Sequence, residues 1–352
     1  MNNPAFFCHL CRVNDNRKPR ECGHWLMMAM LFFSATVWAQ PAVLAGDVAF
    51  SSQGRTGKAV SLDACATLPR FARHLRFVGG LYLSTNLKKR DGLYVMGRLP
   101  NGRLARWRDP SWAETGPVSA YARDRRGHIY LAATPFVQAA DDAAWRYRTI
   151  WKIDSDSGKI APWLTLPVAG KPHAGNPYGI LGMAYDCSTD SLYVTSVMGS
   201  DYDHKKGMVY RIDLRTSAVQ KVLTGIDAMG VLVMTGAGGK RLLLGSARSS
   251  AVLSLPLDHS GQVTGPPRLL FRLQQAPGGR DDRARRLILN NQTGELTIKA
   301  MDFDFTLRTA SEAEERWYHY RYQPANDQWK FSHVETVNDR LRASGLLPGS
   351  DN

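Results

Sequence analysis

The residues best suited to chemistry are acidic pairs in three polar segments. Asp201 and Asp203 lie in "GSDYDH", Asp302 and Asp304 lie in "MDFDF", and two adjacent aspartates lie in "QAADDAA". Ca²⁺ takes six to eight oxygen ligands and accepts irregular loop geometry. The pairs are therefore candidate calcium ligands. The alternative, which the sequence leaves open, is that each aspartate accepts hydrogen bonds from the backbone of its own turn.

Two histidines and four other polar residues complete the candidate set. His173 and His204 could act as a general base. However, no G-x-S-x-G, H-E-x-x-H or Walker sequence supplies a nucleophile, a metal or a phosphate loop. The ligand-binding candidates carry amide, carboxylate or guanidinium groups on predicted loops: Asn86, Asn176, Asp227 and Arg248.

These segments connect β-type runs that repeat along the chain. Residues 178–213 hold three such runs, "GILGMAYD", "DSLYVTSV" and "GMVYRID", and "SAVQKVL" follows as a fourth. The second run recurs as "LYLSTN", "IYLAAT", "LYVTSV", "LLLGSA" and "LTIKAM", at 81, 129, 192, 242 and 296. Apolar and polar residues alternate within the runs, as in half-buried strands. A four-run unit in several copies predicts an all-β fold, a β-propeller of four-stranded antiparallel blades.

Five units can be counted from Gly80 onward, and residues 46–78 could supply a sixth. Within residues 46–78, "LPRFARHLRFV" could be an edge strand or a helical turn. In a propeller, the loops between second and third strands share one face with the loops between blades. Binding residues concentrate on such loops. We therefore expect all the candidates above on one rim.

The segment "NPYGILGMAYDCSTDSLYVTSV" resembles the blade signature of NHL-repeat, gluconolactonase-like and strictosidine-synthase-like propellers. The likeness lies in Gly182, Ala184, Asp186, Leu192, Tyr193, Val194 and Thr195. For the lactonase-like members, the resemblance implies a calcium ion held in the central channel by Glu, Asn and Asp. Asn176 and Asp227 stand at comparable positions. The glutamate that opens the first blade and a second asparagine have no identifiable counterpart.

The N-terminus has the anatomy of a signal peptide. A basic "NRKPR" precedes an uncharged run of 12 residues, Leu26–Val37, and small-residue cleavage signals end at Ala39 or Ala45. The run is short for a membrane span, although a retained anchor is the alternative. We therefore predict a periplasmic or secreted protein. Residues 1–45 would be the processed segment, 46–337 one propeller domain and 338–352 a C-terminal tail.

Two cysteines, Cys65 and Cys187, remain after the predicted cleavage. An oxidising compartment permits them to pair. The bridge would close a loop of more than a hundred residues and stabilise the fold by on the order of 4 kcal/mol. Two unpaired buried thiols are the alternative. Three further cysteines precede the cleavage site, at spacings that match no standard zinc finger.

The net charge of +14 includes only +2 from residues 1–39, so the exported chain stays strongly basic. Such a protein is attracted to anions. Acidic residues interrupt the basic clusters, and aromatic residues are not interleaved with them, which argues against nucleic acid. We predict that the propeller binds a partner protein, an anionic polymer or an anionic small molecule over its loop-rich face. The alternative is a calcium-dependent lactone or ester hydrolase.

Overall fold

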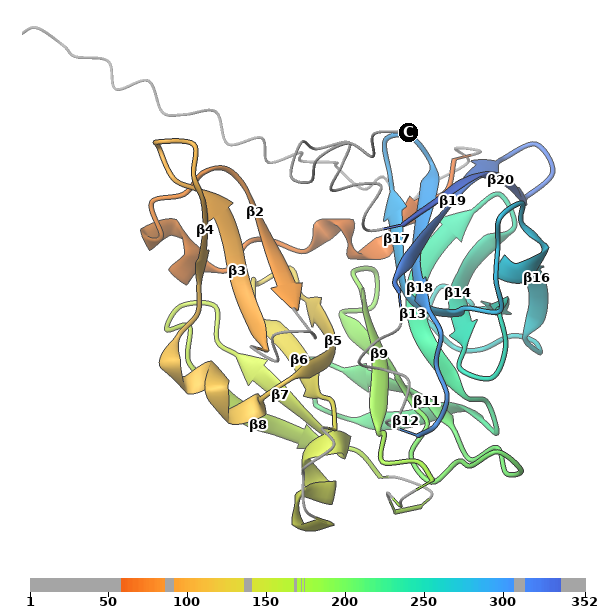
Figure 1. Cartoon of the computed structure of the whole chain (residues 1–352), viewed down its shortest axis with the longest axis horizontal. Coiled ribbons are helices and arrows are strands. Elements are labelled where there is room, and N and C mark those ends of the chain that lie inside the picture. The colour runs from red at the N-terminus through yellow and green to blue at the C-terminus, as the bar shows by residue number, and fades with distance from the viewer. Residues whose placement is uncertain are drawn as a thin grey trace, which may run out of the picture. The chain divides into compact units, whose positions relative to one another are not determined.

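Five antiparallel sheets follow one another along the chain (Figure 1). The computed structural model describes residues 58–85, 92–135, 141–167, 170, 171, 173, 175–306 and 314–336, without the side chains of 141–144. Within these residues the regular structure consists of strands and short 3₁₀ helices. The sheets form a five-bladed β-propeller, so the predicted fold class is confirmed and the choice between five and six blades becomes five in the described residues.

The strands within each sheet follow the chain order. The first sheet is β2 (Val78–Thr85), β3 (Leu93–Arg98) and β4 (Leu104–Trp107), and the second is β5 (Val118–Arg123), β6 (Ile129–Ala133), β7 (Thr149–Ile153) and β8 (Ile160–Thr165). The third is β9 (Ile180–Asp186), β10 (Ser191–Ser196), β11 (Met208–Asp213) and β12 (Val219–Thr224).

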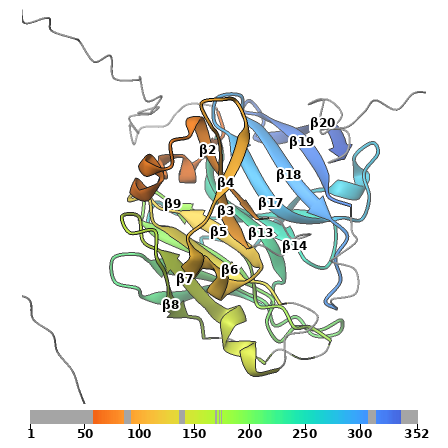
Figure 2. The same ribbon diagram turned by 60° about the vertical axis from the view of Figure 1, so that its left-hand side comes forward.

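The fourth and fifth sheets complete the propeller. The fourth is β13 (Ala228–Gly236), β14 (Gly239–Ser246), β15 (Ala251–Pro256) and β16 (Arg268–Arg272), with the short β1 (Val60–Ser61) added beside β13. The fifth is β17 (Arg283–Asn290), β18 (Glu295–Met301), β19 (Arg316–Gln323) and β20 (Gln328–Thr336). Figure 2 shows β5 and β13 near the middle of the molecule, with β8 and β20 at the periphery.

Four hydrophobic clusters lie between consecutive sheets. One cluster contains Leu93 of the first sheet and Ile129 of the second. The other three clusters join the second sheet to the third, the third to the fourth, and the fourth to the fifth. Alternating apolar residues along the strands supply these clusters, because successive side chains point to opposite faces of a sheet. Among the described residues, no corresponding cluster joins the fifth sheet to the first.

The first sheet has three strands rather than the predicted four. Its innermost strand, β2, contains "LYLST", which corresponds to the second strand of the other units. Residues Leu83–Thr85 of β2 consequently line the central cavity together with residues of β5, β9, β13 and β17. On this side, the strand that lines the cavity therefore corresponds to the second strand of the repeat unit rather than to the first.

The segment that precedes the first sheet spans three inner strands. Val60 pairs with Thr235 of β13, and the Ser61 amide donates a hydrogen bond of 2.6 Å to Asn291 Oδ1 just after β17. Cys65, at the end of the 3₁₀ helix η1 (Leu62–Cys65), forms a disulfide with Cys187 just after β9, and their Cα atoms are 6.2 Å apart. This segment therefore ties the third, fourth and fifth sheets together.

Short 3₁₀ helices account for the other regular segments. "LPRFARHLRFV" contains η2 (Arg70–His74), so a helical turn forms there rather than an edge strand. The connections contain η3 (Pro110–Thr115), η4 (Asp141–Arg148) and η5 (Leu273–Gln275). No helix in the described part of the chain is long and apolar enough to cross a bilayer. The predicted processed segment, 1–45, and the predicted tail, 338–352, lie outside the described residues.

Candidate functional site

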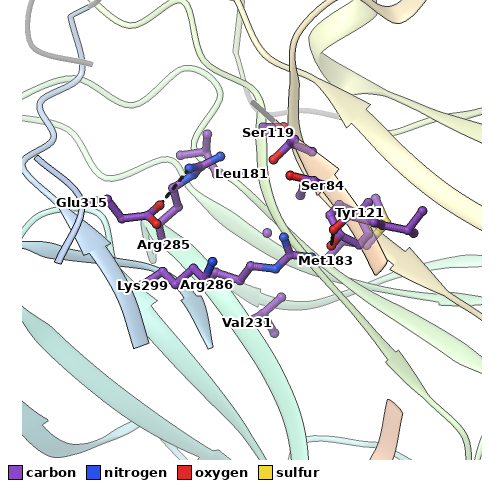
Figure 3. A pocket seen from close by; sticks show the side chains of 14 residues that line it. Ser84, Ser119, Tyr121, Leu181, Met183, Val231, Arg285, Arg286, Lys299 and Glu315 are labelled. Carbon is purple, nitrogen blue, oxygen red and sulfur yellow. Dashed lines mark hydrogen bonds and ion pairs between the residues drawn. The ribbon is translucent and has the colours of Figure 1, made fainter. Parts of the chain in front are cut away.

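A cavity of about 140 Å³ lies at the centre of the propeller, where strands of all five sheets meet (Figure 3). Its lining is polar at the first and fifth sheets and more apolar at the third and fourth. The lining residues used below are Ser84, Thr85, Ser119, Tyr121, Arg285, Arg286, Lys299 and Glu315.

Two consecutive arginines of β17 both line this cavity. Successive side chains of a regular strand point to opposite faces, but the pairing of β17 with β18 shifts register between Ala284 and Arg286. Such a bulge changes the direction in which side chains point. The irregular register thus accounts for both Arg285 and Arg286 reaching the cavity.

Arg285 is largely buried beside a single carboxylate. Its Nη1 lies 3.6 Å from Glu315 Oε2, and its side chain is 17% exposed. Burial lowers the pKa of the Arg285 guanidinium, since removal from water disfavours the charged form. Arginine nevertheless stays protonated in proteins, so a poorly hydrated positive charge persists here.

Arg286 extends across the cavity to the second sheet (Figure 3). Its guanidinium carbon lies 3.9 Å from the centre of the Tyr121 ring, a cation–π distance. The Tyr121 hydroxyl in turn donates to the Leu83 carbonyl, at 2.9 Å. Arg286 is consequently held above an aromatic face.

Two further cations add to the positive charge. Lys299 Nζ lies 3.7 Å from the centre of the Trp317 ring. Burial lowers the pKa of Arg123 at the end of β5, where Arg286 and the Asp63 carboxylate also act on it. Of these charged groups, Arg285, Arg286 and Lys299 line the cavity with one carboxylate, Glu315, whereas Arg123 and Asp63 are not among its lining residues. An excess of positive charge in a recessed site attracts anions.

Hydroxyl groups from the first two sheets lie on the opposite side of the cavity. Ser84 and Thr85 belong to β2, and Ser119 belongs to β5. The Ser119 hydroxyl donates to the Ile180 carbonyl at 2.7 Å, which fixes its position. Guanidinium and hydroxyl groups around one small space can together hold a carboxylate or phosphate.

Asn176, one of the predicted ligand-binding residues, is fully buried and makes structural hydrogen bonds. Its side-chain amide donates to the carbonyls of Val197 at 2.8 Å and Ser200 at 2.9 Å. Its Oδ1 accepts from the Tyr178 amide at 3.0 Å. The side chain thus closes the turn before β9.

Asp227 and Arg248, two further candidates, bind each other. Arg248 Nε donates to Asp227 Oδ2, and Asp227 Oδ1 also accepts from the Ser200 hydroxyl and, at 3.0 Å, from the Gly207 amide. Neither residue lines the central cavity. The fourth candidate, Asn86, lies outside the described residues.

The first predicted metal pair lies in a hydrogen-bonded turn. Asp201 Oδ1 accepts from the amides of Asp203 at 2.9 Å and His204 at 2.7 Å, and His204 Nδ1 lies 2.9 Å from the same oxygen. The backbone hydrogen bond from His204 is the main cause that lowers the Asp201 pKa. This is the turn arrangement that the sequence left as the alternative to a metal site.

The second predicted pair is also partly used in a turn. Asp304 Oδ1 accepts from the Thr306 amide and hydroxyl, both at 2.7 Å, while Asp302 is exposed. In the part of the chain that the structure describes, none of the four predicted metal ligands belongs to a group of three ligands close enough together to hold one metal ion. The four are Asp201, Asp203, Asp302 and Asp304. Calcium binding by these aspartates remains a prediction.

The two predicted bases lie at the surface, in loops. His173 and Asn176 pair through their backbones, and the His173 ring accepts from the Gly175 amide at 3.2 Å. His204 is exposed beside Asp201. Neither histidine lines the central cavity. A different group, His319, His333 and Glu335 of the fifth sheet, has the spacing of metal ligands, and the sequence did not indicate it.

No protein-family model matches the sequence, and no curated protein matches it. The chain is similar in structure to a luciferin-regenerating enzyme, with 12% identity, a TM-score of 0.43, and coverage of 77% of this chain and 80% of that one. It is also similar to a protein from Lactobacillus plantarum, with 12% identity, a TM-score of 0.41, and coverage of 77% and 68%.

A third similar structure is the extracellular domain of a protein from B. thetaiotaomicron, with 11% identity and a TM-score of 0.41. The match covers 80% of this chain but only 29% of that one. None of these similarities bears on an activity. The chain is a β-propeller by its own sheets, with a basic cavity at their centre.

Proposed function

We propose that this propeller binds a small anion, carrying a carboxylate or phosphate group, in its central cavity. The observation that carries the proposal is the convergence of Arg285, Arg286 and Lys299 on one polar cavity. Of the described residues that line the cavity, Glu315 alone is acidic.

The size of the cavity favours a small ligand over a polymer. A volume of about 140 Å³ suits an anionic group with a few further atoms, but not an extended chain. Partly desolvated guanidinium groups bind such anions strongly, because charge-assisted hydrogen bonds gain strength where water is excluded. A partner protein or an anionic polymer would instead use the loop-rich face. Export through a cleaved signal peptide would place the protein in the periplasm or outside the cell.

The test is calorimetric titration of the purified protein with phosphate, citrate and glucuronate at low ionic strength. We expect at least one of them to bind, to raise the melting midpoint, and to bind more weakly as salt is added. Arg286→Gln should weaken binding about tenfold or more, corresponding to about 1.4 kcal/mol. Arg215→Gln is the matched control, since Arg215 is exposed and pairs with Asp213 away from the cavity.

If the wild type, Arg286→Gln and Arg285→Gln bind the anion with equal affinity, the anion does not bind in the cavity. Absence of binding by all three anions would contradict a small-anion ligand. If Arg215→Gln and Arg286→Gln weaken retention on an anionic resin to the same extent, that retention reflects the general surface charge rather than the cavity.

The alternative is a calcium-dependent lactone or ester hydrolase. Its two sequence-derived ligands, Asn176 and Asp227, make internal hydrogen bonds, so the geometry does not favour it. Millimolar calcium that raised the melting midpoint, with loss of the effect in Asp201→Asn, would support that alternative.

A further inference from the structure

The fifth sheet brings three metal-ligand side chains to one face. His319 of β19 lies directly opposite His333 of β20, and Glu335 is two residues further along β20. Residues two apart in a strand share a face, and directly paired residues are close neighbours. One ligand atom from each of these three side chains lies within 4.8 Å of the other two.

The separations suit a small tetrahedral ion. His319 Nε2 lies 3.1 Å from Glu335 Oε1. Two ligands at about 2.0–2.1 Å from a tetrahedral Zn²⁺ are themselves about 3.3 Å apart. The rings of His319 and His333 are stacked, with an angle of 1° between their planes and centroids 4.3 Å apart.

A second carboxylate fixes the orientation of the central ligand. His319 Nδ1 lies 2.7 Å from Glu295 Oε1, and Thr297 Oγ1 lies 3.3 Å from the same nitrogen. A Nδ1–H group that donates to Glu295 leaves the lone pair on Nε2, which is the atom beside Glu335. A carboxylate behind the ligating histidine is the common outer arrangement of protein zinc sites.

The site lies on the face of the fifth sheet that points away from the fourth. Tyr318 and Tyr320, which alternate with His319, are buried in the cluster between those two sheets. The His319 side chain is only 7% exposed, whereas that of Glu335 is 23% exposed and His333 is at the surface. A metal ion can therefore reach a buried, oriented ligand from the solvent side.

The neighbouring charges are mixed. Lys299 stacks on Trp317, which pairs with Glu335, and Arg321 pairs with Glu295. Beside the site, the two formal positive charges of Lys299 and Arg321 are thus equal in number to the two negative charges of Glu295 and Glu335.

We propose that His319, His333 and Glu335 form a site for Zn²⁺ or a similar divalent transition metal. Two imidazoles and one carboxylate satisfy three positions of a tetrahedral ion and leave the fourth open to water or a ligand. The competing explanation is a purely structural histidine held between Glu295 and Glu335, which needs no metal and no contribution from His333.

The test is titration of the chelator-treated full chain with Zn²⁺, and with Co²⁺ for its visible spectrum. We expect a site that gives the absorption of tetrahedral Co²⁺. His333→Ala and Glu335→Gln should each weaken Zn²⁺ binding at that site about tenfold or more and abolish the spectrum. His259→Ala, which removes an exposed histidine from the turn between β15 and β16, should leave both unchanged.

Both test variants change residues that are not fully buried, and circular dichroism with thermal melting would verify their folding. Comparison of the variants also distinguishes Zn²⁺ bound at this site from Zn²⁺ bound by the cysteines of residues 1–45. The proposal is overturned if Zn²⁺ fails to bind, or if it binds with the same affinity and spectrum in His333→Ala and Glu335→Gln. Either result would favour a purely structural role for His319.

Discussion

Arg248 binds the buried carboxylate of Asp227 through Nε, and its remaining nitrogens hold a neighbouring loop. Nη1 donates to the Tyr202 carbonyl at 2.9 Å, and Nη2 donates to the carbonyls of Asp201 at 2.5 Å and His204 at 2.8 Å. One guanidinium thus fixes the loop between β10 and β11 against the start of β13. Two residues that the sequence suggested for ligand binding have a structural role in these contacts.

Replacement of this arginine should therefore destabilise the protein. Arg248→Met leaves a buried carboxylate without its cation, and loss of one partner of a buried pair costs about 3–5 kcal/mol. Urea unfolding measures the change. Arg215→Met, which removes an exposed cation, should change the free energy of unfolding by less than about 1 kcal/mol. Equal midpoints for the two variants would contradict the structural role of Arg248.

The disulfide between Cys65 and Cys187 should contribute much of the stability. It spans 122 residues of sequence, and the chain-entropy model gives about 4–5 kcal/mol for such a loop. We expect Cys65→Ser/Cys187→Ser to unfold at a clearly lower urea concentration than the oxidised wild type. Reductant should lower the wild-type midpoint and leave the double variant unchanged. A wild-type chain in which both thiols react with an alkylating agent before reduction would disprove the bridge.

His128 should make the protein less stable in mild acid. Burial is the main cause that lowers its pKa, with Lys152 acting in the same direction and Asp124 and Asp154 opposing it. Its Nδ1 also accepts a hydrogen bond of 3.0 Å from the Ser155 amide, which requires that nitrogen to be unprotonated. The unfolded chain therefore takes up a proton more readily than the folded one.

The stability contributed by neutral His128 is consequently complete above the unfolded pKa of about 6.5 and is lost as the pH falls below it, toward the lower folded pKa. Urea unfolding between pH 7.5 and 5 should show this decline. His128→Gln should reduce the slope, whereas His259→Gln, at an exposed histidine, should not. An unchanged slope in His128→Gln would assign the decline to other groups.

The Tyr318 hydroxyl should be important for the start of β17. It donates to Asp282 Oδ2 at 2.6 Å and accepts from the Arg280 amide at 3.0 Å, and the side chain is fully buried. Tyr318→Phe removes the hydroxyl donor from the buried Asp282 carboxylate and the acceptor from the partly buried Arg280 amide, which costs about 1–3 kcal/mol. Thermal or urea unfolding measures this cost. Tyr82→Phe, at a side chain that is 49% exposed, should have almost no effect. An equal loss of stability in Tyr82→Phe would contradict the role assigned to the Tyr318 hydroxyl.

The strands could be predicted because their signals are local. The run "GILGMAYD" becomes β9, and the turn after it is formed by Asp186, which accepts from the amide and hydroxyl of Ser188. Alternation and turn residues are sufficient for such hairpins. The three-stranded first sheet could not be anticipated, because the repeat itself suggested that each unit was complete.

The candidate sites depend on relationships that a single strand does not contain. Arg285 and Arg286 share the cavity through a register irregularity, and His319 meets His333 only in one register of β19 against β20. That pairing also shifts just after His319. Long-range pairing sets register, and a slip of one residue would move every side chain to the other face. The loop aspartates were visible in the sequence, but their hydrogen-bond partners were not.

Residues 58–65 make the two ends of the propeller axis different. These residues contact the final part of β13 and the residues just after β9 and β17, whereas the cavity uses earlier positions of the same strands, such as Leu181, Val231 and Arg285. Residues 58–65 are therefore anchored toward one end of these inner strands, and the cavity residues lie toward the other. Replacement of the anchoring residues should accordingly leave the positions that contact a bound anion in place.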